Sequence, residues 1–444
     1  MSNAPKPAIA PPIPGIVGDA IVWIDARFPL VKLYKEQVAD YYAPKNFNFW
    51  YYFGSLAMLI LVMQIVTGIF LTMNYKPDAK FAFASVEYIM RDVSWGWLIR
   101  YMHSTGASMF FLVVYLHMMR GLMYGSYRKP RELLWIFGCM IYLALMAEAF
   151  FGYLLPWGQM SYWGAQVIIN LFGAIPVIGE DLAVWIRGDF SISDATLNRF
   201  FAFHVIALPL VLLGLVAAHL VALHEVGSNN PDGIEINKNP DPNTGTPKDG
   251  IPFHPYYTVK DMFGVVVFLG VFTAIVFFAP EMGGYFLEAP NFIQADPLKT
   301  PEHIAPVWYF TPFYAMLRAV PSNIASFLPA TQFYGVMVMG AATMILFLLP
   351  WLDRGKVKSV RYRGPIYKRF LTAFVISFLV LGYLGVVPTT VWGQFSKGLP
   401  LIGGADVATI VARVLTATYF AFFILMPWYT KVDKEKPEPE RVTF

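Results

Sequence analysis

Eight long runs of apolar residues follow one another along the chain, and polar segments separate them. A helix needs about 20 mostly apolar residues to cross a bilayer, and each run comes near that length. The runs are 49–73, 101–119, 133–155, 200–223, 262–280, 333–352, 370–387 and 414–429. This pattern predicts an all-α integral membrane protein with eight transmembrane helices. The first four runs would form a four-helix bundle, with the other four beside it.

The composition agrees with a membrane protein. Of the 444 residues, 57% are hydrophobic and 14% are charged, whereas about 25% of residues are charged in a soluble protein. These values exclude a disordered chain and a nucleic-acid-binding protein. Cys139 is the only cysteine, so the chain cannot form an internal disulfide.

The basic residues predict the orientation in the membrane. Segments on the side of the N-terminus carry 23 Lys and Arg residues, and the opposite segments carry 10. Because cytoplasmic loops are enriched in these residues, both termini are predicted to be cytoplasmic. Two long connections, 155–200 and 280–333, then lie on the outer side, and loops of that length often carry function.

Four of the seven histidines lie inside apolar runs, two on the second helix and two on the fourth. His103 and His117 are 14 residues apart, which places them within about 40° of one helix face and about 21 Å apart. His204 and His219 lie at matching depths. Two bis-histidine haems stacked across the bilayer require this arrangement. The alternatives are polar residues that bridge neighbouring helices, or a proton relay in a transporter.

One spacing departs from ideal helix geometry. His219 follows His204 by 15 residues, which turns the second ligand about 60° away from the first. Pro209 lies between them and lacks a backbone donor. We therefore predict a kink or a one-residue bulge near Pro209 that restores the facing of the two histidines.

Glycines on the flanking helices repeat the histidine spacing. Gly54 and Gly68 on the first helix are 14 apart, as are Gly138 and Gly152 on the third. Without side chains they leave room for a flat macrocycle, although close helix packing is the simpler explanation.

Two arginines are placed to bind the acidic groups of such a macrocycle. Arg100 and Arg120 each lie three residues from a histidine, toward the nearer membrane surface, where they could pair with haem propionates or extend into the lipid headgroups. Ser55, next to Gly54 on the first helix, is a further expected haem contact.

Four strings identify a family resemblance. They are WLIRYMHSTGAS (97–108), GYLLPWGQMS (152–161), GSNNP (227–231) and PFHPYYTVKD (252–261). With these strings the chain resembles the cytochrome b subunits of respiratory cytochrome bc complexes, the quinol:cytochrome c oxidoreductases of the bacterial inner membrane. In respiratory members the spacing matching 204 to 219 is usually 14, and photosynthetic relatives have 15. Those relatives divide the protein after the fourth helix, whereas this chain continues, which favours the respiratory branch.

The resemblance implies two non-covalent haems b. His103 and His204 would hold a low-potential haem near the outer face, and His117 and His219 a high-potential haem near the inner face. It also implies a Q cycle with ubiquinol and ubiquinone as substrates, coupled to proton translocation. A Rieske iron–sulfur protein, a membrane-anchored c-type cytochrome and a second copy of the complex would be the partners, without nucleic acid. A haem-b anchor serving a dehydrogenase would lack the strings of the outer site.

The resemblance also assigns two quinone sites. The inner, quinone-reducing site falls on His224, Ser228, Asn229, Lys260 and Asp261, for which a helix-end cap and charge cluster is the alternative. The outer, quinol-oxidising site falls on Tyr153, Gly164, Pro306, Val307, Trp308 and Tyr309.

Val307 departs from the family motif, which reads Pro-Glu-Trp-Tyr. Valine cannot accept a proton, so another group must do so if the chemistry is retained. Glu148, in the apolar run of the third helix, is the candidate, and a structural Glu paired with a neighbouring polar group is its alternative. Glu302 is a weaker rival because it looks loop-exposed. Deprotonation could also run through Tyr309, water or the iron–sulfur partner.

These assignments divide the chain into five parts. They are an N-terminal segment (1–48), the haem-binding bundle (49–223), the inner connection with the quinone-reducing residues (224–261), the last four helices with the outer quinol loop (262–429) and a charged tail (430–444).

Overall fold

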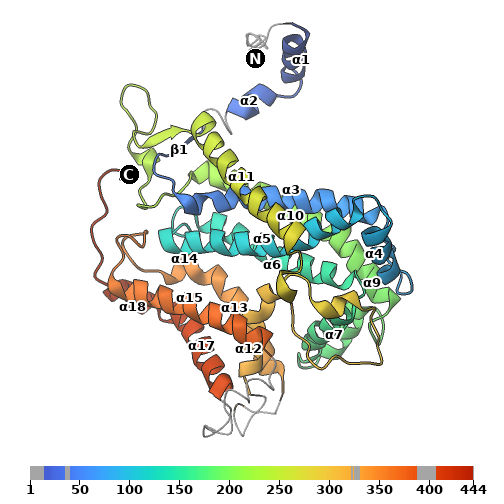
Figure 1. Ribbon diagram of the computed structural model, residues 1–444. Helices are drawn as coiled ribbons and strands as arrows, with labels where there is room; N and C mark the ends of the chain where they lie inside the picture. The colour runs from blue at the N-terminus through green and yellow to red at the C-terminus, as the bar shows by residue number, and fades with distance from the viewer. Residues whose placement is uncertain (1–14, 36–40, 322–323, 325–330, 388–406, 444) are drawn as a thin grey trace.

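The computed structural model describes residues 15–35, 41–321, 324, 331–387 and 407–443 (Figure 1). Within these residues, eight helical segments are long and apolar enough to cross a membrane. They are Phe49–Thr72, Gly96–Tyr124, Glu132–Leu154, Asp194–Val226, Phe253–Phe278, Phe333–Leu352, Pro365–Val386 and Val407–Ile424. The predicted all-α membrane fold with eight crossings is confirmed.

Each crossing is built around one main helix. These are α3 (Tyr52–Thr72), α5 (Gly96–Tyr124), α6 (Glu132–Leu154), α10 (Leu208–Val226), α11 (Phe253–Phe278), α13 (Phe333–Met344), α15 (Pro365–Val386) and α17 (Val407–Ile424). The other helices of four or more residues are α1 (Ile16–Asp25), α2 (Leu30–Tyr34), α4 (Ala82–Arg91), α7 (Gln159–Gly173), α8 (Gly179–Arg187), α9 (Asp194–Ala202), η3 (Phe203–Ala207), η6 (Ala289–Phe292), α12 (Thr311–Ala319), η8 (Ile345–Leu348), α14 (Leu349–Leu352) and α18 (Met426–Val432). Short 3-10 turns are η2 (Phe49–Tyr51), η4 (Ile236–Lys238), η5 (Met282–Gly284) and η7 (Trp308–Phe310).

Several helix ends differ from the apolar runs. Helix α5 extends beyond the run 101–119 at both ends, and α11 begins at Phe253 rather than at 262. A helix can continue past its apolar part, because polar and charged residues at its ends can reach the membrane surface. The predicted run 414–429 is wrong at both bounds, since α17 begins at Val407 and a new helix, α18, starts at Met426 with Pro427 in its first turn.

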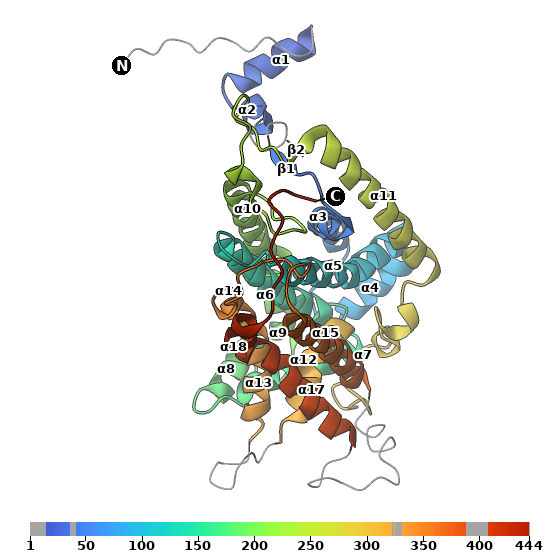
Figure 2. The same ribbon diagram turned by 90° about the vertical axis from the view of Figure 1, so that its left-hand side faces the viewer.

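The long helices form two packed groups that share one apolar core. Helix α3 packs on α5 and α6 on α10, whereas α15 lies between α12 and α17. Figures 1 and 2 show α5 and α6 between α3 and α10 on one side and α12, α15 and α17 on the other. Phe111, Tyr142 and Leu381 belong to the common core and are almost fully buried. The expected bundle with further helices beside it is therefore present.

The fourth crossing contains the expected helix defect. Its first part, α9, passes into the π-helical turn η3, which carries His204 and ends two residues before Pro209. Proline offers no N–H to the carbonyl four residues earlier, and a π turn accommodates one extra residue. This turn takes up the extra residue between His204 and His219, so the prediction of a bulge is confirmed.

One end of the bundle carries the start of α3 and the described C-terminal tail and is called the chain-end side (Figure 1). Here β1 (Tyr42–Pro44) pairs antiparallel with β2 (Gly250–Pro252). The C-terminal tail returns to the same place: Arg441 pairs with Asp249 at 2.9 Å, and the Thr443 hydroxyl donates to Asp232 at 2.9 Å. The opposite end, called the far side, carries α4, α7 and α9 (Figure 1), and α8 packs on α7 and α9.

A buried ion pair fixes the connection between α14 and α15 on the chain-end side. Both Asp353 and Arg363 have fully buried side chains, and the Arg363 guanidinium donates to both carboxylate oxygens of Asp353. Burial raises the pKa of Asp353, but the positive charge and hydrogen bonds of Arg363 outweigh this effect, and the pKa lies below its usual value. Tyr127 adds a hydrogen bond of 2.7 Å to the same carboxylate.

Replacing Asp353 by asparagine is expected to destabilise the protein by about 3–5 kcal/mol, because Arg363 would keep a buried and unpaired charge. The midpoint of thermal unfolding in detergent should fall by several degrees. Asp92→Asn, at an exposed position, is the matched control and should leave the midpoint unchanged. Equal midpoints for the two variants would contradict the role of the ion pair.

Candidate functional site: two facing histidine pairs and their pockets

The four intramembrane histidines face one another in two pairs. The ring centroids of His103 and His204 are 6.1 Å apart, and those of His117 and His219 are 6.4 Å apart. Two imidazoles on opposite sides of one metal ion, with bonds of about 2 Å, place their centroids roughly 6 Å apart. Each pair therefore leaves the space of one metal ion between its rings.

Hydrogen bonds orient the rings of the first pair. The Nδ1 atom of His103 lies 2.9 Å from the Thr67 hydroxyl, and that of His204 lies 2.9 Å from the backbone carbonyl oxygen of Glu148. A second-shell bond at Nδ1 leaves Nε2 as the metal-binding nitrogen. Among the described residues, no group of three or more His, Cys, Asp or Glu side chains could hold a metal ion. Two protein ligands per site fit a metal whose other ligands come from a macrocycle.

Each of the four predicted glycines lies against one of the four histidines. A Cβ atom on Gly54 would lie 3.3 Å from His117 Cε1, and one on Gly68 would lie 3.3 Å from His103 Cε1. On α6, a Cβ atom on Gly138 would lie 3.4 Å from His219 Cε1. Gly152 is the tightest, because its Cβ would lie 2.7 Å from His204 Nδ1. The space of each absent side chain is filled by an imidazole ring.

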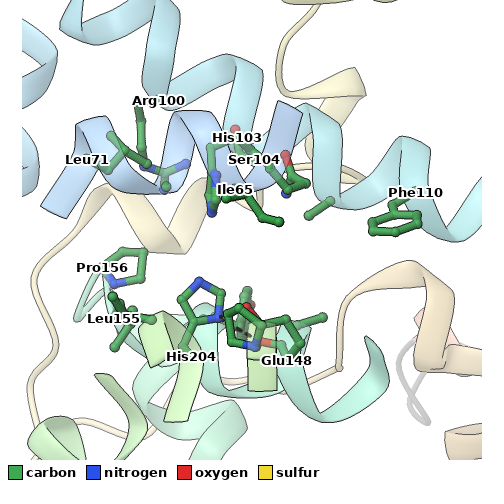
Figure 3. Close-up of a pocket in the computed structure, with 18 of the residues that line it drawn as sticks. Ile65, Leu71, Arg100, His103, Ser104, Phe110, Glu148, Leu155, Pro156 and His204 are labelled. Carbon is green, nitrogen blue, oxygen red and sulfur yellow. Dashed lines mark hydrogen bonds and ion pairs between the residues drawn. The ribbon is translucent and has the colours of Figure 1, made fainter. Parts of the chain in front are cut away.

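A cavity of about 470 Å³ surrounds the first pair (Figure 3). Arg100 lines it, and in Figure 3 its side chain lies beside His103 on the same wall. At the second pair, the Arg120 guanidinium lies 5.0 Å from the Tyr51 ring centre, and its buried Nε has no hydrogen-bond partner. The unpartnered guanidinium nitrogen of Arg120 beside the second pair suits an acidic group of a bound haem. The donors present therefore fit the implied cofactor.

Ser55, a predicted haem contact, and Glu148, the candidate proton acceptor, both have polar partners within the protein. The Ser55 hydroxyl donates to the Tyr52 carbonyl oxygen at 3.0 Å. One carboxylate oxygen of Glu148 lies 3.0 Å from His204 Nδ1, and the other is buried without a partner. Glu148 thus has the polar neighbour that its structural interpretation expects, and its role in proton transfer stays a prediction.

Predicted quinol-site residues come together in the same cavity, which we call the far-side pocket because it surrounds the histidine pair nearer the far side. Tyr153, Val307 and Tyr309 line it. Gly164 packs on Tyr153, since a Cβ there would lie 3.4 Å from the ring. The rings of Tyr309 and Phe111 stack at 3.9 Å.

The turn that follows Pro306 is fixed against α5. Trp308 Nε1 donates to Ser108 at 3.2 Å, and the Tyr115 hydroxyl donates to the Tyr309 carbonyl oxygen at 2.5 Å. Glu302 is exposed, as the sequence suggested.

Sequence reasoning missed two residues of this pocket. Asn291 lines the cavity, and its Nδ2 atom lies 3.1 Å from both the Tyr153 hydroxyl and Glu288 Oε2. Burial raises the pKa of Glu288 to about 7. Both belong to the long connection 280–333, and that length was the one signal in the sequence that pointed to them.

A second pocket of about 220 Å³, which we call the chain-end pocket, lies on the chain-end side and brings together His224 and Ser228. Tyr41, which the sequence did not single out, stacks on His224 at 4.7 Å and exchanges a hydrogen bond of 2.7 Å with Ser228. Asn229 is buried beside them, and its side chain donates to the Tyr124 carbonyl oxygen at 2.7 Å.

The two predicted residues of α11 do not line this pocket. Lys260 extends toward the Phe47 carbonyl oxygen at 3.4 Å, and Asp261 is a hydrogen-bond partner of Ser55. The predicted quinone-reducing set is therefore divided between the described pocket and the start of α11.

Comparisons with known proteins cover nearly the whole chain. The family "Cytochrome b/b6/petB" matches residues 38–227, and "Cytochrome b(C-terminal)/b6/petD" matches residues 294–420. Cytochrome b of Allochromatium vinosum is 65% identical, over 95% of this chain and 97% of its own length. Cytochrome b of Rhodospirillum rubrum is 48% identical, over 96% of each chain.

A solved structure has the same fold. A chain of "Hyperthermophilic respiratory Complex III" superimposes with a TM-score of 0.80 at 38% identity, over 93% of this chain and 99% of that chain. With the histidine pairs in place and relatives matched over nearly their whole length, the chain belongs to the cytochrome b family of bc1 complexes, the respiratory complex III.

Proposed function

We propose that the chain is the electron-carrying subunit of a quinol:cytochrome c oxidoreductase that works by a Q cycle. It oxidises ubiquinol at the far-side pocket and reduces quinone at the chain-end pocket, with proton release and uptake on opposite sides. The observation that carries this proposal is the arrangement of two facing histidine pairs, with centroids 6.1 and 6.4 Å apart, the first of which lines the far-side pocket.

Four histidines would hold the two haems b. His103 with His204 would bind the low-potential haem, and His117 with His219 the high-potential haem. When bound, the haems supply one-electron carriers that connect the two pockets across the membrane. Arg100 and Arg120 would pair with the acidic groups of the haems, and the four glycines let the ligand rings approach the helices.

At the far-side pocket, the protein orients quinol and excludes water. Tyr153 and Tyr309 offer polar atoms at the edge of a mainly apolar cavity, and buried Val307 replaces the acid of the family motif. Gly164 keeps space beside Tyr153, and Trp308 anchors the turn after Pro306 to α5. A dry pocket of this kind favours electron transfer to two separate acceptors over side reactions.

At the chain-end pocket, the protein supplies protons to quinone. His224 and Ser228 provide exchangeable protons at the pocket wall, and Tyr41 holds both in place. Asn229 fixes the backbone that carries Ser228. Lys260 and Asp261 of α11 would complete the route from the aqueous phase when quinone is bound.

The charge distribution supports a cytoplasmic chain-end side in a bacterial inner membrane. The segments on this side carry 23 of the 33 Lys and Arg residues. The far-side pocket then faces the periplasmic partners, a Rieske protein and a membrane-anchored c-type cytochrome. The whole complex would work as a homodimer in the lipid membrane.

Glu148→Gln tests the two interpretations of this residue. Because its carboxylate is paired with His204, removal of the negative charge is expected to raise the midpoint potential of the far-side haem and to leave the pH profile of turnover unchanged. Redox titration and quinol-dependent cytochrome c reduction measure the two effects. A lost pH dependence with an unchanged potential would instead favour Glu148 as the proton acceptor.

A direct activity assay tests the proposed function as a whole. Membranes that contain the complete complex should reduce cytochrome c with quinol as the electron donor. Membranes carrying a His103→Leu chain should not, because the far-side metal position loses a ligand. Equal rates in the two preparations would contradict the proposal.

A further inference from the structure

A partly buried carboxylate lies directly behind the wall of the far-side pocket. Glu288 precedes the short helix η6 and makes no capping bond to it. Its Oε2 atom instead accepts a hydrogen bond of 3.1 Å from Asn291 Nδ2. The same Nδ2 atom lies 3.1 Å from the Tyr153 hydroxyl. One amide group therefore holds the carboxylate and the phenol together.

Tyr153 and Asn291 line the pocket, whereas Glu288 is not among its lining residues. The Tyr153 hydroxyl is also a hydrogen-bond partner of the Glu288 carboxylate. This places a proton-accepting oxygen one hydrogen bond away from a hydroxyl that a quinol can contact. Val307, at the position of the motif acid, lines the same pocket and has no such oxygen.

The surroundings of Glu288 keep its proton affinity high. The titratable groups that face it are Tyr153 from α6 and Tyr309 from η7. In the part of the chain that the structure describes, no Lys, Arg or His forms an ion pair with Glu288. Burial raises the pKa of Glu288 to about 7, and burial, with a smaller contribution from the charge of Glu288, raises the pKa of Tyr309. A base with a pKa near the working pH is best suited to proton transfer.

We propose that Glu288 accepts a proton from ubiquinol through the Tyr153 hydroxyl and so replaces the acid that Val307 lacks. This inference rests on the proposed quinol oxidation at the same pocket. The quinol hydroxyl gives its proton to the Tyr153 oxygen while the Tyr153 proton moves to the carboxylate, so the tyrosine is unchanged. Glu288 then releases the proton to the far-side solution. The other quinol proton and one electron would pass to the iron–sulfur partner, and the second electron would pass to the haem that His103 and His204 would hold, so that quinone is the product.

The test compares Glu288→Gln with Glu288→Asp in the complete complex. Quinol-dependent cytochrome c reduction is measured from about pH 6 to pH 9, together with haem content. In the unmodified complex the rate should rise with pH through about 7, because only the ionised carboxylate accepts a proton. Glu288→Gln should lower the rate by about 100-fold and abolish this rise, whereas Glu288→Asp should keep the rise at a reduced rate.

One control and one further test variant make the result specific. Glu281→Gln alters an exposed acid at the start of the same connection and should leave rate and pH profile unchanged. Tyr153→Phe removes the relay hydroxyl and should also abolish the rise. If Glu288→Gln fails to assemble, the Asp and Phe variants still decide the question through their pH profiles.

The outcome that overturns the inference is a Glu288→Gln complex with full haem content and an unchanged pH profile. Loss of the rise in Glu148→Gln alone would also overturn it. Failure of the proposed function is a different result, because the unmodified complex would then lack haem or would not oxidise quinol at all.

Discussion

Replacing His204 by leucine should remove one of the two haems and leave the other in place. His204 faces only His103, at 6.1 Å between ring centroids, and the second pair lies at another depth with its own ligands. Leucine fills a similar volume but offers no metal-binding nitrogen. The haem content per chain should fall from two to one, and quinol oxidation should fall by at least about 100-fold, because the electron path from the far-side pocket is interrupted.

The matched control is His254→Leu, which alters an exposed histidine at the start of α11. This variant should keep both haems. Haem extraction and the reduced-minus-oxidised spectrum measure the content of each preparation. Two haems in His204→Leu would mean that the facing pair is not a ligand pair.

Gly152→Ala should have nearly the same effect without touching a ligand. A Cβ atom at Gly152 would lie 2.7 Å from His204 Nδ1, which is closer than atoms in contact allow. His204 sits in the π turn η3 and also bonds to the Glu148 carbonyl oxygen, so it has little freedom to move aside. We expect loss of the far-side haem, or a large shift of its midpoint potential, with the second haem unaffected.

Gly214→Ala separates this steric effect from the general effect of a helical alanine. Gly214 lies on α10, and a Cβ atom there would meet nothing within 4 Å. Alanine should be neutral at this position or stabilise the helix by up to about 1 kcal/mol. A Gly152→Ala complex with both haems at normal potentials would contradict this expectation, because it would show that the His204 ring can move away from the added Cβ atom.

Features governed by helical geometry were predictable from the sequence. An α-helix has a fixed rise and rotation per residue, so a spacing of 14 residues predicts that two residues share a helix face at two depths in the membrane. This rule placed His103, His117, Gly54 and Gly68 from the sequence alone. The 15-residue spacing from His204 to His219 also predicted the helix defect near Pro209. The sequence could not show that each glycine faces an imidazole ring rather than an open surface.

Features of the loops were not predictable in the same way. Glu288 and Asn291 reach Tyr153 only because the connection after α11 folds back over the pocket, and no periodic rule describes such a path. Tyr41 reaches His224 through the pairing of β1 with β2, which are more than 200 residues apart. The sequence also could not predict the partner of Glu148, because a carboxylate in an apolar run can either transfer protons or pair with a polar neighbour.

A stepwise redox titration of the purified complex, with the visible spectrum recorded at each potential and a pyridine haemochrome count, tests the central claim most directly. Four histidines in two facing pairs predict two b-type haems per chain that titrate at separate potentials. A preparation whose cytochrome b chain is colourless, or that binds a single haem, would contradict the account.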